Sequence, residues 1–493
     1  MKALILIMVA VLVAAGPAPA RADTLRQETV AGYARDGYQL HPLPGGVSPT
    51  WRSATAPRVD PQPHDEQGVR LFNWQGTLVD HPVVQVTWGF ENINAYELTH
   101  DQFFLDRAAA QAQRNLDRRV ESRGAWWYPY GFDLTRCGTG QVLTAPWFSG
   151  MAPGLLLSLF VRLYGVTDDP KWREAADRTL DSLTLGPDPD GPWVTWVDPD
   201  GYLWLDEYPD SPPGVRGEQV FNGMIYASYG VYDYWRLTGD PRAVALFDGT
   251  ATTVRRYVPT GMRVPGWASR YGIGCPVSYA NYHQDHTVQM TMLHRLTHAG
   301  LFAAYADVLR ADYPYPVVSG RVVFEAGVHV GYRFDSAGQV VASKTMTLGR
   351  ASMAHTDQRV RVRGRDVHYR IVDGALAGYL VAEEPGRRWL AAKVVEHLYT
   401  PTRLLAVEPG TYTGHTFDSF WNVTGSKTVT FPRQSSAPLG ASAVINGELH
   451  YRVTAGTYVG FWLPARAGLW LPDVPASVSG VRSVGASKAA MRG

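Results

Sequence analysis

Two internal repeats of different kinds divide the chain into a helical part and a β-rich part. The first repeat lies between Trp88 and Tyr313, where apolar segments of helical length alternate with short turns. Gly150-Met151 opens one such segment and Gly223-Met224 opens another, 73 residues farther along, and an Asp-Pro pair follows each segment. Asp is a good N-cap and Pro fits the first turn of a helix, so each Asp-Pro pair predicts the start of a second helix. The repeat unit is therefore a helical hairpin.

This pattern predicts several helical hairpins in a row. We expect helices over 155–164 and 225–235, and the helices of the flanking pairs within 96–120 and 286–310. Four consecutive hairpins predict an α/α toroid whose inner helices line a cleft at one end. A plain helical bundle is the alternative that the pattern leaves open.

The second repeat begins after Pro314, where the pattern changes to alternating β-branched residues. Residues 327–336 read GVHVGYRFDS, and residues 410–419, which follow 83 positions later, read GTYTGHTFDS. Two copies of one β-rich module are therefore expected, at 316–397 and 398–475. Such modules resemble those appended to secreted bacterial envelope enzymes, where they would hold wall or glycan. A β domain that only packs against the helical core is the alternative.

The N-terminus is typical of a secretory signal peptide over 1–22. Lys2 is followed by an uncharged apolar run at 3–15, and Ala20-Arg21-Ala22 offers an A-x-A cleavage site. The apolar run is shorter than the roughly 20 residues that a membrane span needs. We therefore expect a secreted protein, extracellular or associated with the cell envelope, and no transmembrane span after cleavage. An uncleaved anchor is the alternative.

The rest of the chain divides by composition. We expect an extended or irregular segment at 23–85, the helical domain at 86–313, and a disordered, small and polar tail at 476–493. The formal net charge is +1, and it becomes −1 once Lys2 and Arg21 leave with the signal peptide. A nucleic-acid-binding protein usually carries a broad basic surface, so nucleic acid is not an expected partner.

Two further features of the composition bear on partners and on cross-linking. The chain has 16 Trp and 26 Tyr, side chains that stack on the apolar faces of sugar rings and that also fill protein cores. Its two cysteines, Cys137 and Cys275, can pair in an exported protein, and the sequence leaves their pairing open.

Residues suited to chemistry gather in two loops of the helical part. The first loop contains Trp204 and Glu207-Tyr208-Pro209, and it leads to Asn222 at the start of the next helical segment. The second contains Trp267 and Arg270 and leads to Tyr282-His283. A guanidinium can grip a carboxylate through two parallel hydrogen bonds, so this pattern favours an acidic substrate.

Together, and in this order, these motifs resemble the C-terminal domain of the D-glucuronyl C5-epimerases. The resemblance runs over about 147–296 and rests on Ser149-Gly150-Met151-Ala152, Asp206-Glu207-Tyr208-Pro209, Phe221-Asn222-Gly223, Leu237-Thr238-Gly239-Asp240, Arg270, Tyr282-His283, His286 and Gln289. It implies an α/α barrel and the conversion of glucuronate to iduronate in heparosan-type chains.

The resemblance also implies roles for particular residues. Glu207 and Tyr208 fall on the family's catalytic glutamate and tyrosine, Tyr282 on its later catalytic tyrosine, and Arg270 on its substrate-binding arginine. Trp267 stands where the family has another tyrosine, and an indole can stack on a sugar but cannot exchange a proton. The full expected set is Glu207, Tyr208, Tyr282 and His283 as catalytic residues and Arg270, Trp267, Asn222 and Trp204 as substrate-binding residues.

The expected reaction is C5-epimerisation of glucuronate residues in a uronic-acid polysaccharide by proton transfer on two faces. The same carbanion can expel the oxygen at C4, so a polysaccharide lyase is the nearest alternative. A hydrolase would need two carboxylates at the right separation, such as Glu207 with Asp206 or Asp285. A non-catalytic glycan-binding protein is the alternative from another class. No cofactor is expected, and no metal, because His283 and His286 lack a clear third ligand.

Overall fold

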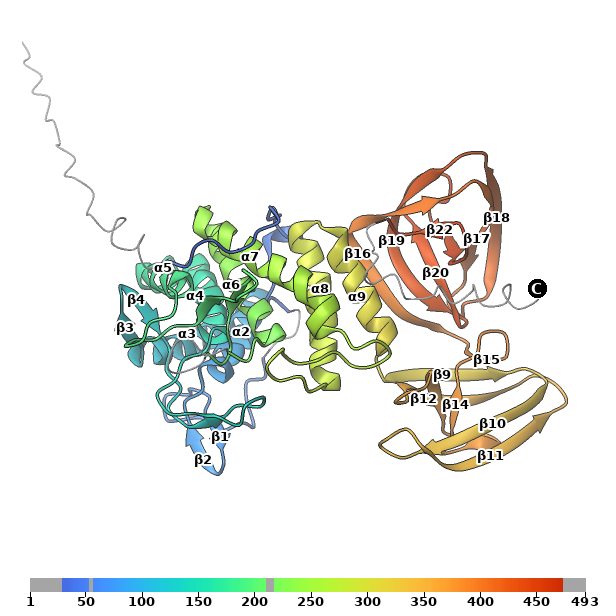
Figure 1. The fold of residues 1–493 in the computed structure, drawn as a ribbon, viewed down its shortest axis with the longest axis horizontal. Coiled ribbons are helices and arrows are strands. Elements are labelled where there is room, and N and C mark those ends of the chain that lie inside the picture. The colour runs from blue at the N-terminus through green and yellow to red at the C-terminus, as the bar shows by residue number, and fades with distance from the viewer. Residues whose placement is uncertain (1–28, 53–55, 210–216, 473–493) are drawn as a thin grey trace, which may run out of the picture.

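The computed structural model describes residues 29–52, 56–209 and 217–472 (Figure 1). The predicted signal peptide, 1–22, and the predicted disordered tail, 476–493, lie outside these ranges. Helices fill the first part of the described chain and strands the last, and α8 and α9 stand between the other helices and the β sheets (Figure 1). The predicted α + β organisation, with the helical part first, is confirmed.

The helical part consists of helical hairpins, and the two helices of each hairpin pack on each other: α2 on α3, α4 on α5, α6 on α7 and α8 on α9. The first helices of the hairpins, α2, α4, α6 and α8, also pack on one another in that order. A ring of helices that closes into a toroid stays a prediction. The helices are α2 Pro82–Thr99, α3 Gln102–Asp117, α4 Met151–Thr167, α5 Pro170–Thr184, α6 Phe221–Thr238, α7 Pro241–Tyr257, α8 Ala280–Thr297 and α9 Gly300–Asp312.

The Asp-Pro pairs begin helices, as their sequence predicts. The carboxylate of Asp169 accepts a hydrogen bond from the Lys171 amide at the start of α5, and that of Asp240 accepts from the Arg242 amide at the start of α7. The preceding helix, α6, ends at Gly239, whose φ of 69° is easy for glycine. The stretch 96–120 holds the end of α2 and all of α3, and the stretch 286–310 holds most of α8 and most of α9.

Glycines bring α4 and α6 close together. A Cβ added to Gly154 would lie 2.2 Å from the Cα of Ala227, and one added to Gly230 would lie 1.8 Å from the carbonyl oxygen of Gly154. Even alanine would therefore force the two helices apart. The contact sets α6 at a fixed depth in the core, and the N-terminus of α6 forms part of the candidate site below.

Short hairpins and turns lie at the ends of the helices. The segment 23–85 was expected to be extended or irregular. It contains the β-hairpin of β1 and β2 and the first residues of α2. The short elements are η1 Pro44–Gly46, β1 Phe72–Trp74, β2 Thr77–Val79, β3 Val120–Ser122, β4 Ala125–Trp127, β5 Leu134–Thr135, β6 Val142–Leu143, β7 Thr195–Val197, β8 Leu203–Leu205 and the π-helical turn η2 Val258–Met262.

The β-rich part contains two seven-stranded sheets with the same strand order. One runs β11-β10-β14-β13-β12-β9-β15 and the other β18-β17-β21-β20-β19-β16-β22. Their strands are β9 Val317–Phe324, β10 Gly327–Phe334, β11 Val340–Leu348, β12 Ser352–Arg361, β13 Val367–Ile371, β14 Leu380–Ala382, β15 Arg388–Leu390, β16 Lys393–Val407, β17 Gly410–Phe417, β18 Val423–Phe431, β19 Ser435–Ile445, β20 Glu448–Val453, β21 Trp462–Pro464 and β22 Leu469–Trp470. A short 3-10 turn, η3 Gly374–Leu376, precedes β14.

The second sheet is attached to the helical domain through an ion-pair cluster. Asp307 of α9 accepts hydrogen bonds from the Tyr399 hydroxyl at 2.7 Å, from His397 at 2.6 Å and from Arg403 at 2.5 Å, and these three residues belong to β16. Burial alone would raise the pKa of Asp307, but the charges of His397 and Arg403 lower it to about 2. The helical domain and the second sheet therefore share an ion-pair cluster in which His397 and Arg403 are buried and Asp307 is partly exposed.

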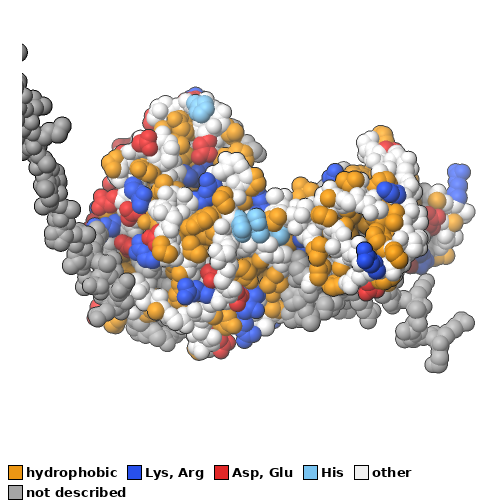
Figure 2. All heavy atoms as spheres, turned by 90° about the horizontal axis from the view of Figure 1, so that it is seen from above, with side chains coloured by type: hydrophobic (Ala, Val, Ile, Leu, Met, Phe, Trp, Pro, Cys, Tyr) orange, Lys and Arg blue, Asp and Glu red, His pale blue; other side chains and the backbone are white. Residues whose placement is uncertain are grey.

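The surface shows no field of a single charge on the face drawn in Figure 2. Basic and acidic side chains are intermixed over the helical lobe, and a narrower waist joins this lobe to the β-rich lobe (Figure 2). Within the described ranges, no helix is both long and apolar enough to cross a membrane.

Candidate active site

A buried carboxylate fixes the loop that carries two of the predicted catalytic residues. Asp206 follows β8 directly and is fully buried. It accepts hydrogen bonds from the Trp196 indole at 3.0 Å and from the amide of Tyr208 at 3.1 Å. A Cβ on Gly217 would lie 1.8 Å from its carboxylate, so the chain passes very close to it. Asp206 therefore holds the loop in place, and its oxygens are occupied by these contacts rather than open to a substrate.

Glu207 lies against the N-terminus of α6. Its side chain is 8% exposed, and a Cβ on Gly223 would lie 2.2 Å from Glu207 Oε2. Only a glycine at this position leaves room for the carboxyl group beside the helix. Burial raises the pKa of Glu207 to about 7, while hydrogen bonds from Tyr208 and Tyr271 oppose the rise. Near neutral pH this carboxyl group can therefore either accept or donate a proton.

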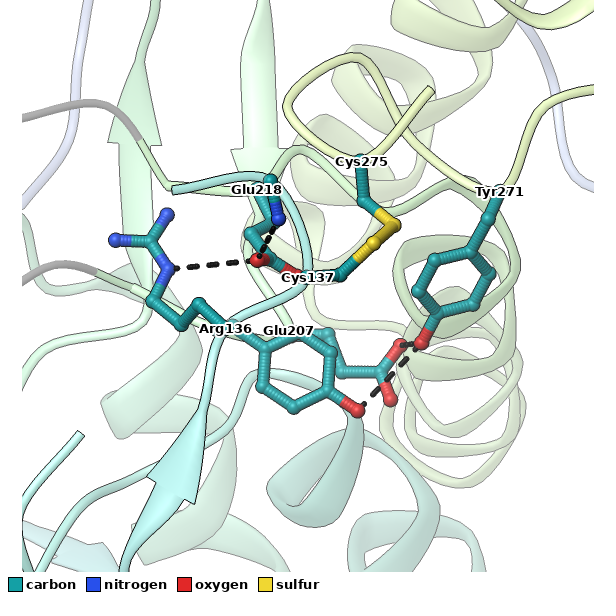
Figure 3. The surroundings of a disulfide bond; sticks show 8 residues. Arg136, Cys137, Glu207, Glu218, Tyr271 and Cys275 are labelled. Atoms are coloured by element: carbon teal, nitrogen blue, oxygen red, sulfur yellow. Dashed lines mark hydrogen bonds and ion pairs between the residues drawn. A yellow bond between two sulfur atoms is a disulfide. The ribbon is translucent and has the colours of Figure 1, made fainter. Parts of the chain in front are cut away.

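Tyr271 forms the centre of a group of phenols around this carboxylate. Its hydroxyl lies 3.4 Å from Glu207 Oε2 and 3.5 Å from the hydroxyl of Tyr208, and its ring centroid lies 4.5 Å from that of Tyr282. Figure 3 shows Tyr271 directed from its own loop toward Glu207. Burial raises the pKa of Tyr208, Tyr271 and Tyr282, and the nearby charge of Glu207 adds to the rise. All three phenols are therefore protonated hydrogen-bond donors at neutral pH.

A disulfide bond lies beside this group (Figure 3). Cys137 and Cys275, whose pairing the sequence left open, are joined, with their Cα atoms 5.4 Å apart. Next to the disulfide, the amide of Gly138 donates to Glu218 Oε1 at 3.0 Å, and the Arg136 guanidinium lies 3.7 Å from the same oxygen. The disulfide and this buried ion pair tie residues 136–138 to the two loops that carry Glu207 and Tyr271.

His283, a predicted catalytic residue, has both ring nitrogens engaged. Nδ1 accepts from the amide of Ser269 at 2.9 Å, so Nε2 carries the proton and donates to the carbonyl of Tyr313 at 3.1 Å. Ser269 Oγ also lies 2.8 Å from Nδ1 of His286. Burial lowers the pKa of His283 and lowers that of His286 to about 3, so both rings are neutral. In this arrangement His283 holds the second loop against α8.

The predicted substrate-binding residues lie in different surroundings. Trp204 is fully buried, and its indole donates to Asp198 at 2.9 Å, which argues against contact with a substrate. Trp267 packs on Tyr313 with ring centroids 5.3 Å apart, on the side toward the first β sheet. Arg270 is partly exposed, and its guanidinium donates to the carbonyl of Gly261 at 3.3 Å.

Three buried polar atoms near the N-terminus of α6 have no hydrogen-bond partner among the described residues. They are Oδ1 of Asn222, Oε1 of Gln289 and Nε2 of His286. The amide nitrogen of the Gln289 side chain donates to the Asn222 carbonyl at 2.9 Å, which places two of the three on facing helices. Of the predicted substrate-binding residues, Asn222 therefore keeps an unsatisfied acceptor, and it precedes Gly223, against which Glu207 lies.

The structure thus brings Glu207, Tyr208 and Tyr282 together, and it adds Tyr271, which was not among the predicted site residues. Its place directly after Arg270 could have indicated it, but Tyr271 lies 64 positions from Glu207 along the chain. Within the described ranges, no group of three or more His, Cys, Asp or Glu side chains is arranged to hold a metal ion.

Comparison with known proteins agrees with the motifs found in the sequence. Residues 119–310 match the family model of the D-glucuronyl C5-epimerase C-terminus. A D-glucuronyl C5-epimerase of Caenorhabditis elegans is 28% identical over 122 residues, which are 25% of this chain and 18% of that protein. Residues 119–310 are therefore similar to the C-terminal part of the D-glucuronyl C5-epimerases, as the motifs predicted, while the chain spans less than a fifth of that relative.

Solved structures resemble the chain only distantly. The cellobiose 2-epimerase of Spirochaeta thermophila has a TM-score of 0.36 at 16% identity, over 50% of this chain and 63% of that one. The cellobiose 2-epimerase of Bacillus thermoamylovorans has a TM-score of 0.36 at 14% identity, over 47% of this chain and 58% of that one. Similarity of this size carries no conclusion about the site.

Proposed function

We propose that this protein removes and returns the proton on C5 of uronate residues in a polysaccharide, with C5-epimerisation of glucuronate as the net reaction. The observation that carries the proposal is the environment of Glu207, a buried carboxyl group with a pKa of about 7 that faces two phenols. The match of residues 119–310 to the family model of the epimerase C-terminus supports the same chemistry.

The reaction needs a cation or hydrogen-bond donors at the substrate carboxylate. The C5 proton lies next to that carboxylate, and its removal places negative charge on the carboxyl group in the transition state. Arg270 is the proposed clamp, because it carries a permanent charge and is partly exposed on the loop that also carries Tyr271. The unsatisfied acceptor of Asn222 is proposed to receive a hydroxyl group of the sugar.

Inversion at C5 needs one group that takes the proton and another that returns it on the opposite face. Glu207 is the proposed base, since a group with a pKa near the working pH is efficient at proton transfer. Tyr282 is the proposed acid, because burial raises the pKa of its phenol and keeps it protonated. Tyr208 supports Glu207 as a neighbouring donor.

The wider setting of the reaction is also part of the proposal. The substrate is a uronic-acid polymer of the heparosan type, and the helical hairpins form an α/α toroid with the site at one end. The chain is exported by the signal peptide at 1–22, and the two β modules at 316–397 and 398–475 hold cell-envelope glycan near the enzyme.

The test is incubation of the purified protein with uronate polymers in heavy water, followed by NMR. Deuterium at C5 together with new iduronate signals supports epimerisation, and the Glu207→Gln variant is the matched control. A 4,5-double bond would make the protein a lyase instead. Binding of a polymer without deuterium uptake or cleavage would overturn the proposal and leave a glycan-binding protein.

A further inference from the structure

Tyr271 occupies the position at which the predicted proton-transfer groups meet. It touches Glu207 and Tyr208 through its hydroxyl and Tyr282 through its ring, and its side chain is 7% exposed. Trp267, three positions before Arg270, packs on Tyr313 instead. The third phenol at this site, beside those of Tyr208 and Tyr282, therefore comes from residue 271.

We propose that Tyr271 is a positioning residue for Glu207. Its hydroxyl stabilises the ionised form of the Glu207 carboxyl group and keeps that group in place beside the phenols of Tyr208 and Tyr282. The effect of Tyr271 on catalysis rests on the function proposed above, whereas the effect of Tyr271 on Glu207 does not.

The backbone around Tyr271 is fixed on the same helix terminus that holds Glu207. The Tyr271 carbonyl accepts from the amide of Phe221 at 3.1 Å, at the first residue of α6, and the Tyr271 amide donates to Val277 at 2.8 Å. Glu207 lies against Gly223, two residues farther along α6. One rigid helix end therefore sets the distance between the phenol and the carboxylate.

Close backbone contacts on the other side leave this loop little freedom. A Cβ on Gly272 would lie 2.8 Å from the carbonyl oxygen of Glu218, and one on Gly138 would lie 1.7 Å from that of Gly274. The disulfide joins Cys275, the next residue, to Cys137. The loop is thus built to present Tyr271 at one place.

The chemical effect of this position follows from the protonation of the phenol. A protonated hydroxyl that donates to a carboxylate stabilises its ionised form and so opposes the effect of burial. Without the Tyr271 hydroxyl, Tyr208 is the remaining phenol donor to Glu207. Burial then raises the pKa of Glu207 further, because one of the opposing hydrogen bonds is lost. The ionised base would then be available only at higher pH.

The first test measures Glu207 directly and needs no substrate. Full-length protein labelled with 13C at the glutamate carboxyl carbon is titrated by NMR, and Glu207→Gln assigns the signal. We expect Tyr271→Phe to move the Glu207 midpoint upward by about one pH unit, the size expected for one hydrogen bond to a charged group. Tyr279→Phe is the matched control, because this exposed phenol of the same loop should leave the midpoint unchanged.

The second test uses C5 deuterium exchange. We expect Tyr271→Phe to move the acid limb of the pH profile upward by the same amount, with KM nearly unchanged. A variant that lost thermal stability without either shift would show a purely structural role and overturn the inference. If the Phe variant fails to fold, replacing Tyr271 with 3-fluorotyrosine, which keeps the ring and makes the phenol a stronger donor, should lower the same midpoint, and an unmoved midpoint refutes the inference. If the parent protein exchanges no C5 proton, the proposed function fails while the NMR titration still decides the role of Tyr271.

Discussion

Replacing Glu207 with Gln tests what burial does to the central carboxyl group. Gln has the size of a protonated Glu and can still accept a hydrogen bond from Tyr271, but it never ionises. Burial raises the pKa of Glu207 from 4.5 in the unfolded chain to about 7 in the folded protein. Because the folded value is the higher one, the favourable contribution is complete below the unfolded pKa and is lost as the pH rises through the folded pKa.

The size of this loss follows from the two pKa values. A rise from 4.5 to about 7, at about 1.4 kcal/mol for each pH unit, means that ionised Glu207 costs the folded state about 3 kcal/mol above neutral pH. The variant avoids this cost. We therefore expect the stability of Glu207→Gln relative to the parent to increase by about 2 to 3 kcal/mol between about pH 5 and about pH 8.

The measurement is urea unfolding followed by tryptophan fluorescence at several pH values, with Glu66→Gln as a control at an exposed glutamate. The control should follow the parent at every pH. If Glu207→Gln showed the same pH dependence as the parent, Glu207 would ionise at the same pH in the folded and unfolded chains. The argument that burial tunes this residue for proton transfer would then be refuted.

Four other substitutions test neighbouring parts of the structure. Tyr282→Phe should lower C5 deuterium exchange by about 10²- to 10⁴-fold, the usual contribution of a positioned acid or base, with binding of the polymer unchanged by calorimetry. Gly223→Ala should lower exchange by about 100-fold, because the new Cβ would lie 2.2 Å from the Glu207 carboxylate and displace it. This loss is expected even though Ala favours helices more than Gly does. Unchanged exchange would contradict the contact. Replacing Cys137 and Cys275 with Ser should destabilise the protein by about 5 kcal/mol in urea, because the disulfide closes a loop of 138 residues. Asp307→Asn should lower the free energy of unfolding, measured in urea, by about 3 kcal/mol at neutral pH. The difference should shrink as the pH falls from 3.8, the pKa of Asp307 in the unfolded chain, toward about 2, its pKa in the folded protein.

The helical hairpins could be predicted because their signals are local. Each Asp-Pro pair caps its own helix, and the carboxylates of Asp169 and Asp240 make the expected hydrogen bonds. The exact turns within 96–120 and 286–310 could not be predicted, since His100 and His298 adopt left-handed conformations that their side chains do not signal. The attachment of the second sheet at Asp307 also depends on packing across 90 or more residues, which no local pattern encodes.

Motifs in the sequence indicated some of the residues that the structure brings together, but they did not indicate Tyr271, which only the fold places there. Glu207 and Tyr282 followed from motifs and lie in one cluster with Tyr271. His283 belonged to the same motif, but its role depends on the partners of both ring nitrogens, which the sequence does not reveal. Trp204 was expected among the substrate-binding residues because it lies in the same loop as Glu207, yet its large apolar side chain lies in the core.

The loop at 263–271 connects the candidate site to the first β sheet. At one end, Trp267 packs on Tyr313 and lies 5.9 Å from the Arg363 guanidinium, which belongs to the turn after β12. At the other end, Tyr271 reaches Glu207. Because the loop is also held to α8 through Ser269, a displacement of the sheet would act on the site through a short and rigid segment. The β-rich part is therefore joined physically to the candidate site, whether or not it binds glycan as proposed.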